Sequence, residues 1–294
     1  RSPAGSLHWP ISAAGPGLAT FSASQHLAAI FCPRPAGGGL IMDVKDTAEP
    51  VSFSREVFLD HLQQPLVIHQ ISPSDVGGVV WDGALVLANF LSKFKPEFTR
   101  DATIVELGAG TGVVGLACAT LPARKVIITD LPELRDLVER NIAQNRALLL
   151  ADSIEFVALD WTRPTDLALG ATKPKLILAS ECVYYEDAVE PLLKTMDYLS
   201  GPESRIFVSF ELREQEKHVE TLRQFIALAK TMFDVKEVPR HEQHEDYNSS
   251  DIKVLLLVKK KELVSSQLGL GYVCCLLRYR FAVNKVCTVS YSRK

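Results

Sequence analysis

The sequence lacks cysteines at C-x-x-C spacing, long apolar runs and an excess of basic charge. Its six cysteines are scattered over 294 residues without a C-x-x-C pair or a histidine at metal-ligand spacing, so we expect neither a disulfide framework nor a metal site. No apolar run approaches the roughly 18 residues that a membrane helix needs, and the chain does not open with a signal-peptide pattern. A net charge of -3 gives no reason to expect nucleic acid or an anionic membrane as a partner. These absences predict a soluble, cytoplasmic protein, which we expect to be a monomer.

The two ends of the chain differ in composition from its middle. Residues 1–41 are rich in Gly, Pro, Ala and Ser without helical or strand periodicity, which predicts a disordered or non-native leader before a biological start at Met42. Residues 262–294 form an atypical tail that contains a Cys-Cys pair and no clear period. We therefore expect a single folded domain over residues 42–261.

The middle of the chain alternates short apolar runs with helical patterns, after a hairpin or cover expected at 51–58 and 66–71. Such alternation predicts a Rossmann-like α/β fold, with a seven-stranded, mostly parallel sheet covered by helices on both faces. Only a polar loop separates the last two apolar runs, so we expect an antiparallel strand pair at the C-terminal end. The predicted strands are 104–107, 126–129, 154–159, 176–179, 206–210, 233–238 and 252–258, and the predicted helices are 81–94, 113–120, 133–148, 187–199 and 216–229.

Residues 104–115 read as a buried strand that enters a glycine-rich turn and opens a helix. Glycines permit positive φ and let a ligand approach the main chain, so ligand binding is favoured over a plain turn. Gly110, Gly112 and Gly115 also fit the dinucleotide fingerprint, which leaves NAD open on spacing alone. The carboxylate of Glu106 would repel a pyrophosphate, whereas it suits the positive amino group of S-adenosylmethionine. The pattern therefore favours S-adenosyl-L-methionine as cofactor.

Two further strand ends carry side chains that suit this cofactor. Asp130 follows Gly110 by 20 residues and can accept both ribose hydroxyls, although a helix-capping role is an alternative that can coexist. Trp161 follows another predicted strand and could lie along the adenine face, with a place in the core as its alternative.

The segment from Ser180 to Tyr185 follows the fourth predicted strand, and its sequence is Ser-Glu-Cys-Val-Tyr-Tyr. In an open α/β sheet, ligands bind outside the carboxyl ends of the strands, so this turn should face the glycine loop. Glu181 and the two tyrosines are then placed to hold an incoming amine and exclude water, and a solvated turn is the alternative.

Taken together, residues 51–261 resemble the lysine-directed branch of the family 16 seven-β-strand methyltransferases. The resemblance rests on 79–82, the loop 106–115, Asp130, 160–161 and the acidic-x-x-Tyr motif at 181–184. It implies catalytic roles for Glu181 and Tyr184 near a substrate lysine. It also implies cofactor contacts from Trp81, Gly108, Ala109, Gly110, Asp130, Trp161 and Ser180, beside the contact from Glu106 argued above. The family motif often begins with Asp, so Glu181 is one methylene longer.

Segments 190–195 and 241–261 resemble the members of the family that act on the valosin-containing AAA ATPase, so the resemblance implies this protein substrate. Two rival functions are a catalytically silent S-adenosylmethionine-binding interaction module and an NAD(P)-linked oxidoreductase, although the latter lacks an evident hydride-transfer set. The ionic loop 241–246 is expected to be solvated or to lie along the substrate protein rather than to bind a metal.

Overall fold

The computed structural model describes residues 51–72, 76–94, 96–169 and 172–260. All of these residues belong to one compact unit. The predicted leader, the start at Met42 and the tail 262–294 lie outside the described residues. No described helix combines the length and the apolar character that a membrane span requires.

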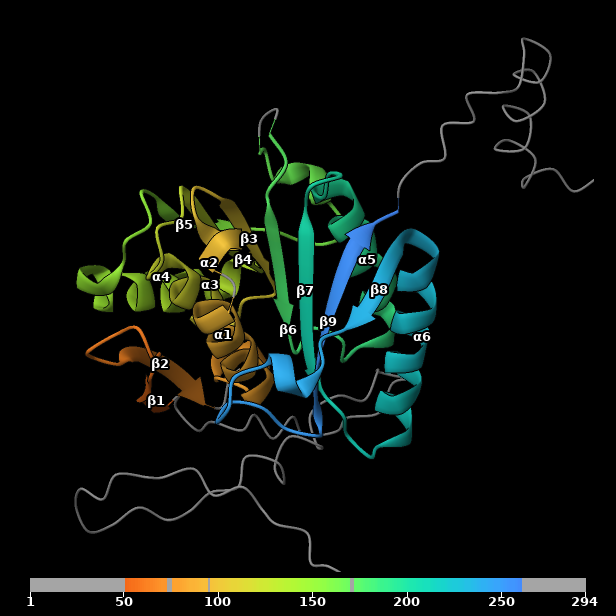
Figure 1. The fold of residues 1–294 in the computed structure, drawn as a ribbon, viewed down its shortest axis with the longest axis horizontal. Helices are drawn as coiled ribbons and strands as arrows, with labels where there is room; N and C mark the ends of the chain where they lie inside the picture. The colour runs from red at the N-terminus through yellow and green to blue at the C-terminus, as the bar shows by residue number, and fades with distance from the viewer. Residues whose placement is uncertain (1–50, 73–75, 95, 170–171, 261–294) are drawn as a thin grey trace, which may run out of the picture. The chain divides into compact units, whose positions relative to one another are not determined.

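A seven-stranded sheet with the order β5-β4-β3-β6-β7-β9-β8 organises the fold (Figure 1). The first five strands in this order are parallel, and β9 runs antiparallel to both β7 and β8. The predicted fold class, including the antiparallel C-terminal pair, is confirmed. The strands are β3 (Thr103–Leu107), β4 (Lys125–Asp130), β5 (Ile154–Ala158), β6 (Leu176–Ser180), β7 (Arg205–Glu211), β8 (Phe233–Glu237) and β9 (Ile252–Lys259).

Helices cover both faces of the sheet and form two separate cores with it (Figure 1). Because successive side chains of a strand point to opposite faces, Ile104 packs in one core and Val105 in the other. The first core includes side chains of α1 (Asp82–Phe94), α3 (Val113–Ala119) and α4 (Arg135–Gln144). The second includes α5 (Glu186–Leu199) and α6 (Glu216–Met232). This double cover explains why the parallel strands read as continuous apolar runs.

The helical pattern predicted over 133–148 is divided in the structure. A 3-10 turn η4 (Pro132–Leu134) precedes α4, and another, η5 (Arg146–Leu148), follows it. The helix α4 ends at Gln144, and the next side chain, Asn145, bonds to the main chain of β2 instead of facing solvent. Four further short helical segments that were not predicted are η3 (Val76–Gly78), α2 (Pro96–Thr99), η6 (Pro164–Asp166) and η7 (Arg240–Glu242).

The antiparallel hairpin of β1 (Val51–Val57) and β2 (Leu66–Ser72) confirms the predicted cover. Two asparagines one turn apart, Asn141 on α4 and Asn145 directly after it, bond to the main chain of β2. Asn141 accepts a hydrogen bond from the His69 N–H (2.7 Å) and donates to the His69 carbonyl (3.1 Å). Asn145 repeats the pattern at Val67, with distances of 2.8 and 2.9 Å. The helix therefore supplies side chains where β2 would otherwise need another strand.

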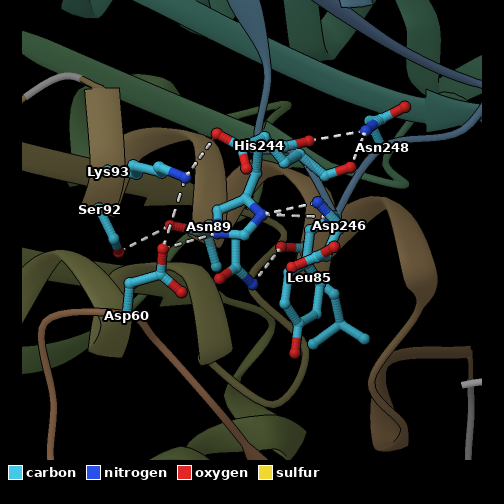
Figure 2. Close-up of polar contacts among 11 residues, drawn as sticks. Asp60, Leu85, Asn89, Ser92, Lys93, His244, Asp246 and Asn248 are labelled. Atoms are coloured by element: carbon cyan, nitrogen blue, oxygen red, sulfur yellow. Dashed lines mark hydrogen bonds and ion pairs between the residues drawn. The ribbon is translucent and has the colours of Figure 1, made fainter. Parts of the chain in front are cut away.

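The loop between β8 and β9 is anchored by His244, whose side chain is only 3% exposed. Its Nδ1 accepts hydrogen bonds from the main-chain N–H groups of Asp246 and Tyr247 (3.1 and 3.2 Å), so Nε2 carries the proton and donates to Asp60 (3.0 Å; Figure 2). Lys93 pairs with the same Asp60. The expectation that this ionic loop is solvated is wrong at His244, because its buried imidazole accepts hydrogen bonds from the main-chain N–H groups of the turn.

Candidate active site

The carboxyl ends of β3, β4 and β6 meet at one edge of the sheet, where the glycine loop leaves β3. Gly108, Gly110 and Gly112 have φ of +58°, +56° and +78°, which L side chains rarely adopt. Thus the loop conformation itself requires these glycines. Gly112 precedes α3 as the left-handed residue at its start.

Each of three glycines also faces a protein neighbour. A Cβ at Gly108 would lie 2.7 Å from the Cys182 sulfur and 2.8 Å from the Trp161 ring. At Gly110 it would lie 2.7 Å from the Gly77 carbonyl, and at Gly115 2.6 Å from Oε2 of Glu106. The sequence predicts that the glycines leave space for a ligand. In the structure, the glycine loop also packs so closely against neighbouring residues of the protein that there is no room for a Cβ.

Glu106 lies buried at the end of β3 and holds the glycine loop. Its Oε2 accepts a hydrogen bond from the Gly115 N–H at 2.8 Å, whereas Oε1 is buried and has no hydrogen-bond partner. Burial raises the pKa of Glu106 to about 8, and the bond from Gly115 opposes this rise. The observed contact of Glu106 is therefore with the loop, and its predicted contact with the cofactor stays a prediction.

Asp130 ends β4 and reaches the same loop. Its Oδ2 accepts from the Gly110 N–H (2.7 Å) and its Oδ1 from the Leu131 N–H (2.7 Å). Because a carboxylate oxygen accepts more than one hydrogen bond, both oxygens can still receive a ribose hydroxyl. Burial raises the pKa of Asp130, while the two main-chain bonds lower it.

Trp161 and Ser180 complete the side of the site predicted to bind the cofactor. The Trp161 ring lies against Gly108, as the short distance to its ideal Cβ shows, and Ser180 ends β6 beside Ser209 of β7. The half-buried ring, the diol acceptor at Asp130 and the unpartnered buried oxygen of Glu106 suit adenine, ribose and a positive group respectively. The residues present therefore fit S-adenosylmethionine.

Glu181 is held in an unusual position just beyond β6. It has φ +55°, and its N–H donates to the Ser209 carbonyl at 2.8 Å. The Ser209 hydroxyl in turn donates to the Gly83 carbonyl at 2.9 Å, which ties β7 to the first turn of α1. The Glu181 carboxyl packs against Gly83, and its Oε1 is buried without a hydrogen-bond partner. Burial raises the pKa of Glu181 to about 7, while a main-chain hydrogen bond from Glu211 and then the charge of Arg213 oppose the rise.

Arg213 is a site residue that the sequence argument missed. Its guanidinium lies over the Trp81 ring (5.0 Å) and the Tyr184 ring (5.5 Å), and Nη2 lies 3.9 Å from Oε2 of Glu181. Its position two residues after β7, at the carboxyl edge of the sheet, could have indicated that Arg213 lies at the site.

The predicted site residues form two adjoining groups. Gly108, Ala109, Gly110, Asp130 and Trp161 surround the loop, with Glu106 buried at its base. The second group contains Glu181, Tyr184 and Trp81, linked through Arg213; the prediction had placed Trp81 at the cofactor, and that contact stays a prediction. Cys182 joins the groups, because its S–H lies 3.3 Å from the Leu107 carbonyl. Among the described residues, no group of three or more His, Cys, Asp or Glu side chains could hold a metal ion.

Known proteins that are similar to this chain include lysine methyltransferases. A family model described as lysine methyltransferase matches residues 61–230. Protein-lysine methyltransferase METTL21E of Mus musculus is 31% identical over 191 residues, which are 63% of this chain and 72% of that protein. Protein N-lysine methyltransferase METTL21A of Danio rerio is 32% identical over 186 residues, which are 63% of this chain and 79% of that protein.

Solved structures include a TehB-like SAM-dependent methyltransferase from Corynebacterium glutamicum. It is 19% identical, with a TM-score of 0.42 over 63% of this chain and 90% of that one. The fold assignment rests instead on the strand order given above.

Proposed function

Because this chain belongs to the lysine methyltransferase family and is an S-adenosylmethionine-dependent protein-lysine methyltransferase, we propose that Glu181 and Tyr184 receive the acceptor lysine beside the glycine loop. The observation that carries the assignment is the Glu181 carboxyl, which has a buried oxygen without a partner and lies one residue from the Cys182 contact to that loop. An oxidoreductase is set aside, because the family uses a methyl donor.

S-adenosylmethionine supplies an activated methyl group on a positive sulfur. The protein then has chiefly to align a neutral amine with it, which is a task of proximity and orientation. Glu181 attracts the lysine ammonium and orients it, and the rings of Tyr184 and Trp81 keep water away. Desolvation lowers the pKa of the lysine, so the proton leaves to water before transfer. In this proposal Glu181 is a positioning group rather than the base.

Asp130, Gly108, Ala109, Gly110, Trp161 and Ser180 hold the donor in this proposal. The Asp130 carboxylate accepts the ribose hydroxyls while its existing bonds to Gly110 and Leu131 fix its direction. Trp161 lies along the adenine, next to Gly108. Glu106 holds the loop closed through Gly115 and favours the positive amino group with its remaining oxygen.

The proposed substrate is a lysine of the valosin-containing AAA ATPase, on the sequence resemblance at 190–195 and 241–261. The second stretch includes the loop fixed by His244, so its exposed acidic residues Glu242, Glu245 and Asp246 have a defined place to meet a substrate protein. We further propose that the enzyme acts as a monomer in the cytoplasm.

A methyl-transfer assay with labelled donor and the full chain tests the proposal, with the valosin-containing ATPase and a cell lysate as acceptors. Asp130→Ala removes two charge-assisted ribose bonds of about 1.5–3 kcal/mol each, so donor affinity should fall at least about a hundredfold. Asp152→Ala is the matched control, because Asp152 is exposed just before β5, near the opposite edge of the sheet. Calorimetric titration with S-adenosylhomocysteine measures the affinity.

The outcomes separate the parts of the proposal. Label on the ATPase that Asp130→Ala abolishes and Asp152→Ala preserves supports donor site and substrate together. Label on another lysate protein alone keeps the reaction and rejects the ATPase. Donor binding with no label on any protein rejects the reaction in favour of a silent binding module.

A further inference from the structure

We propose that Arg213 is a positioning residue for methyl transfer, because its guanidinium fixes the two rings and the carboxylate that surround the acceptor lysine. The inference rests on the proposed function and adds a residue to it.

Arg213 connects three segments that lie far apart in the sequence. Trp81 precedes α1, Tyr184 follows β6, and Arg213 follows β7. The guanidinium carbon lies 5.0 Å from the Trp81 ring centre and 5.5 Å from that of Tyr184, distances at which a cation is attracted to an aromatic face. One planar group therefore sets the separation of both rings.

The direction of the guanidinium is fixed from its other side. Its Nε donates to Oε2 of Glu211 at 3.1 Å, at the last residue of β7. This bond leaves the Nη groups for Glu181, whose Oε2 lies 3.9 Å from Nη2. Only 22% of the Arg213 side chain and 10% of the Glu181 side chain are exposed, so solvent does little to loosen the arrangement. The other carboxyl oxygen of Glu181, Oε1, is buried against Gly83, so the side chain has little freedom to turn away from Arg213.

The charge of Arg213 acts on both the carboxylate and the substrate. It favours ionised Glu181, which can then attract a lysine ammonium. Once that lysine is in place, the same positive charge disfavours its protonated form and so favours the neutral amine that accepts the methyl group. The titratable and charged groups around this position are Glu211 on β7, Cys182 beside Glu181, and His218 of α6, whose ring lies 5.8 Å from that of Tyr184.

Two substitutions separate the planar contacts from the charge. Arg213→Gln removes both, whereas Arg213→Lys keeps the charge and loses the planar stack. Arg223→Gln is the matched control, because Arg223 is an exposed arginine on α6 that pairs with Glu220. Full-length proteins are compared at saturating donor, on whichever protein acceptor the wild type labels, across a range of pH.

For Arg213→Gln we expect kcat to fall at least about tenfold, since reacting groups lose their alignment, while donor affinity stays within about twofold. The acid limb of its kcat/KM profile should move to higher pH, because the charge that lowers the pKa of Glu181 in the free enzyme is gone. Arg213→Lys should share the loss in kcat but keep the wild-type acid limb. Arg223→Gln should match the wild type in both.

Two results would overturn the inference while the proposed function stands. One is an Arg213→Gln enzyme with wild-type kcat and pH profile. The other is an Arg213→Gln enzyme whose melting temperature, donor affinity and kcat fall together, which would assign Arg213 to the fold. Failure of the proposed function itself would appear differently, as a wild-type protein that binds donor and labels no acceptor.

Discussion

Gly83 lies in the first turn of α1, against the carboxyl group of Glu181. A Cβ built on Gly83 would lie 2.0 Å from Oε1 and 2.9 Å from the carboxyl carbon of Glu181. The backbone of Gly83 does not require glycine, because Gly83 is not among the described residues with positive φ. A glycine inside a helix is less stable than alanine by about 1 kcal/mol. Gly83 therefore lowers the stability of α1 slightly and leaves space for the long side chain of Glu181.

We predict that Gly83→Ala lowers methyl transfer at least about tenfold without lowering thermal stability. The new methyl group displaces the flexible end of Glu181 instead of the backbone, and α1 gains up to about 1 kcal/mol in propensity. Initial rates and melting temperatures measure the two effects. Gly83→Ala with Glu181→Asp should recover part of the rate, because the shorter carboxyl leaves room for the methyl. A fully active single variant would contradict the role given to Glu181.

At the scale of elements, β2 and α4 meet through hydrogen bonds in place of a third hairpin strand. Asn141 bonds both main-chain groups of His69, and its amide also donates to the Thr111 carbonyl in the glycine loop at 3.0 Å. One buried side chain thus joins the hairpin, α4 and the loop predicted to bind the cofactor. Loss of such a side chain leaves main-chain groups without partners in the protein interior, which is costly.

Asn141→Ala should therefore destabilise the protein by about 1–3 kcal/mol. Urea unfolding followed by far-ultraviolet circular dichroism measures the change. Gln144→Ala is the control on the same helix, and it should change the free energy of unfolding by less than about 0.5 kcal/mol because Gln144 is exposed. Equal effects of the two substitutions would mean that the asparagine contacts add no stability.

The sequence predicts which segments form strands and helices better than it predicts which elements lie next to one another. The central strands of the sheet, β3, β4, β6 and β7, were identifiable as apolar runs, because burial on both faces leaves a strong pattern. The pattern did not predict that β9 inserts between β7 and β8, since pairing order depends on tertiary packing. Arg213 was missed for a related reason. It is one of 32 basic residues, and only the structure brings it to Trp81 and Tyr184.

At the scale of the whole molecule, a buried carboxyl group in the middle of the sheet links the site to overall stability. Glu106 is on β3, the strand between β4 and β6, and it is almost completely excluded from solvent. An ionised carboxylate is unfavourable there, so the folded protein keeps the proton to a higher pH than the unfolded chain does. The same group fixes Gly115 and hence the start of α3.

This linkage predicts that stability declines as pH rises. The folded-state pKa of Glu106 is raised from 4.5 to about 8, so between these values the folded state binds more protons than the unfolded state, and the free energy of unfolding falls with pH. Glu106→Gln cannot ionise and should remove that part of the decline, a difference of a few kcal/mol over the range. Urea midpoints at several pH values measure the slope, with exposed Glu203→Gln as control. Asp130 and Glu181 titrate in every variant, so the comparison isolates the contribution of Glu106. A Glu106→Gln slope equal to that of the wild type would show that Glu106 is ionised in the folded protein. A positive charge would then have to compensate its free carboxyl oxygen at neutral pH.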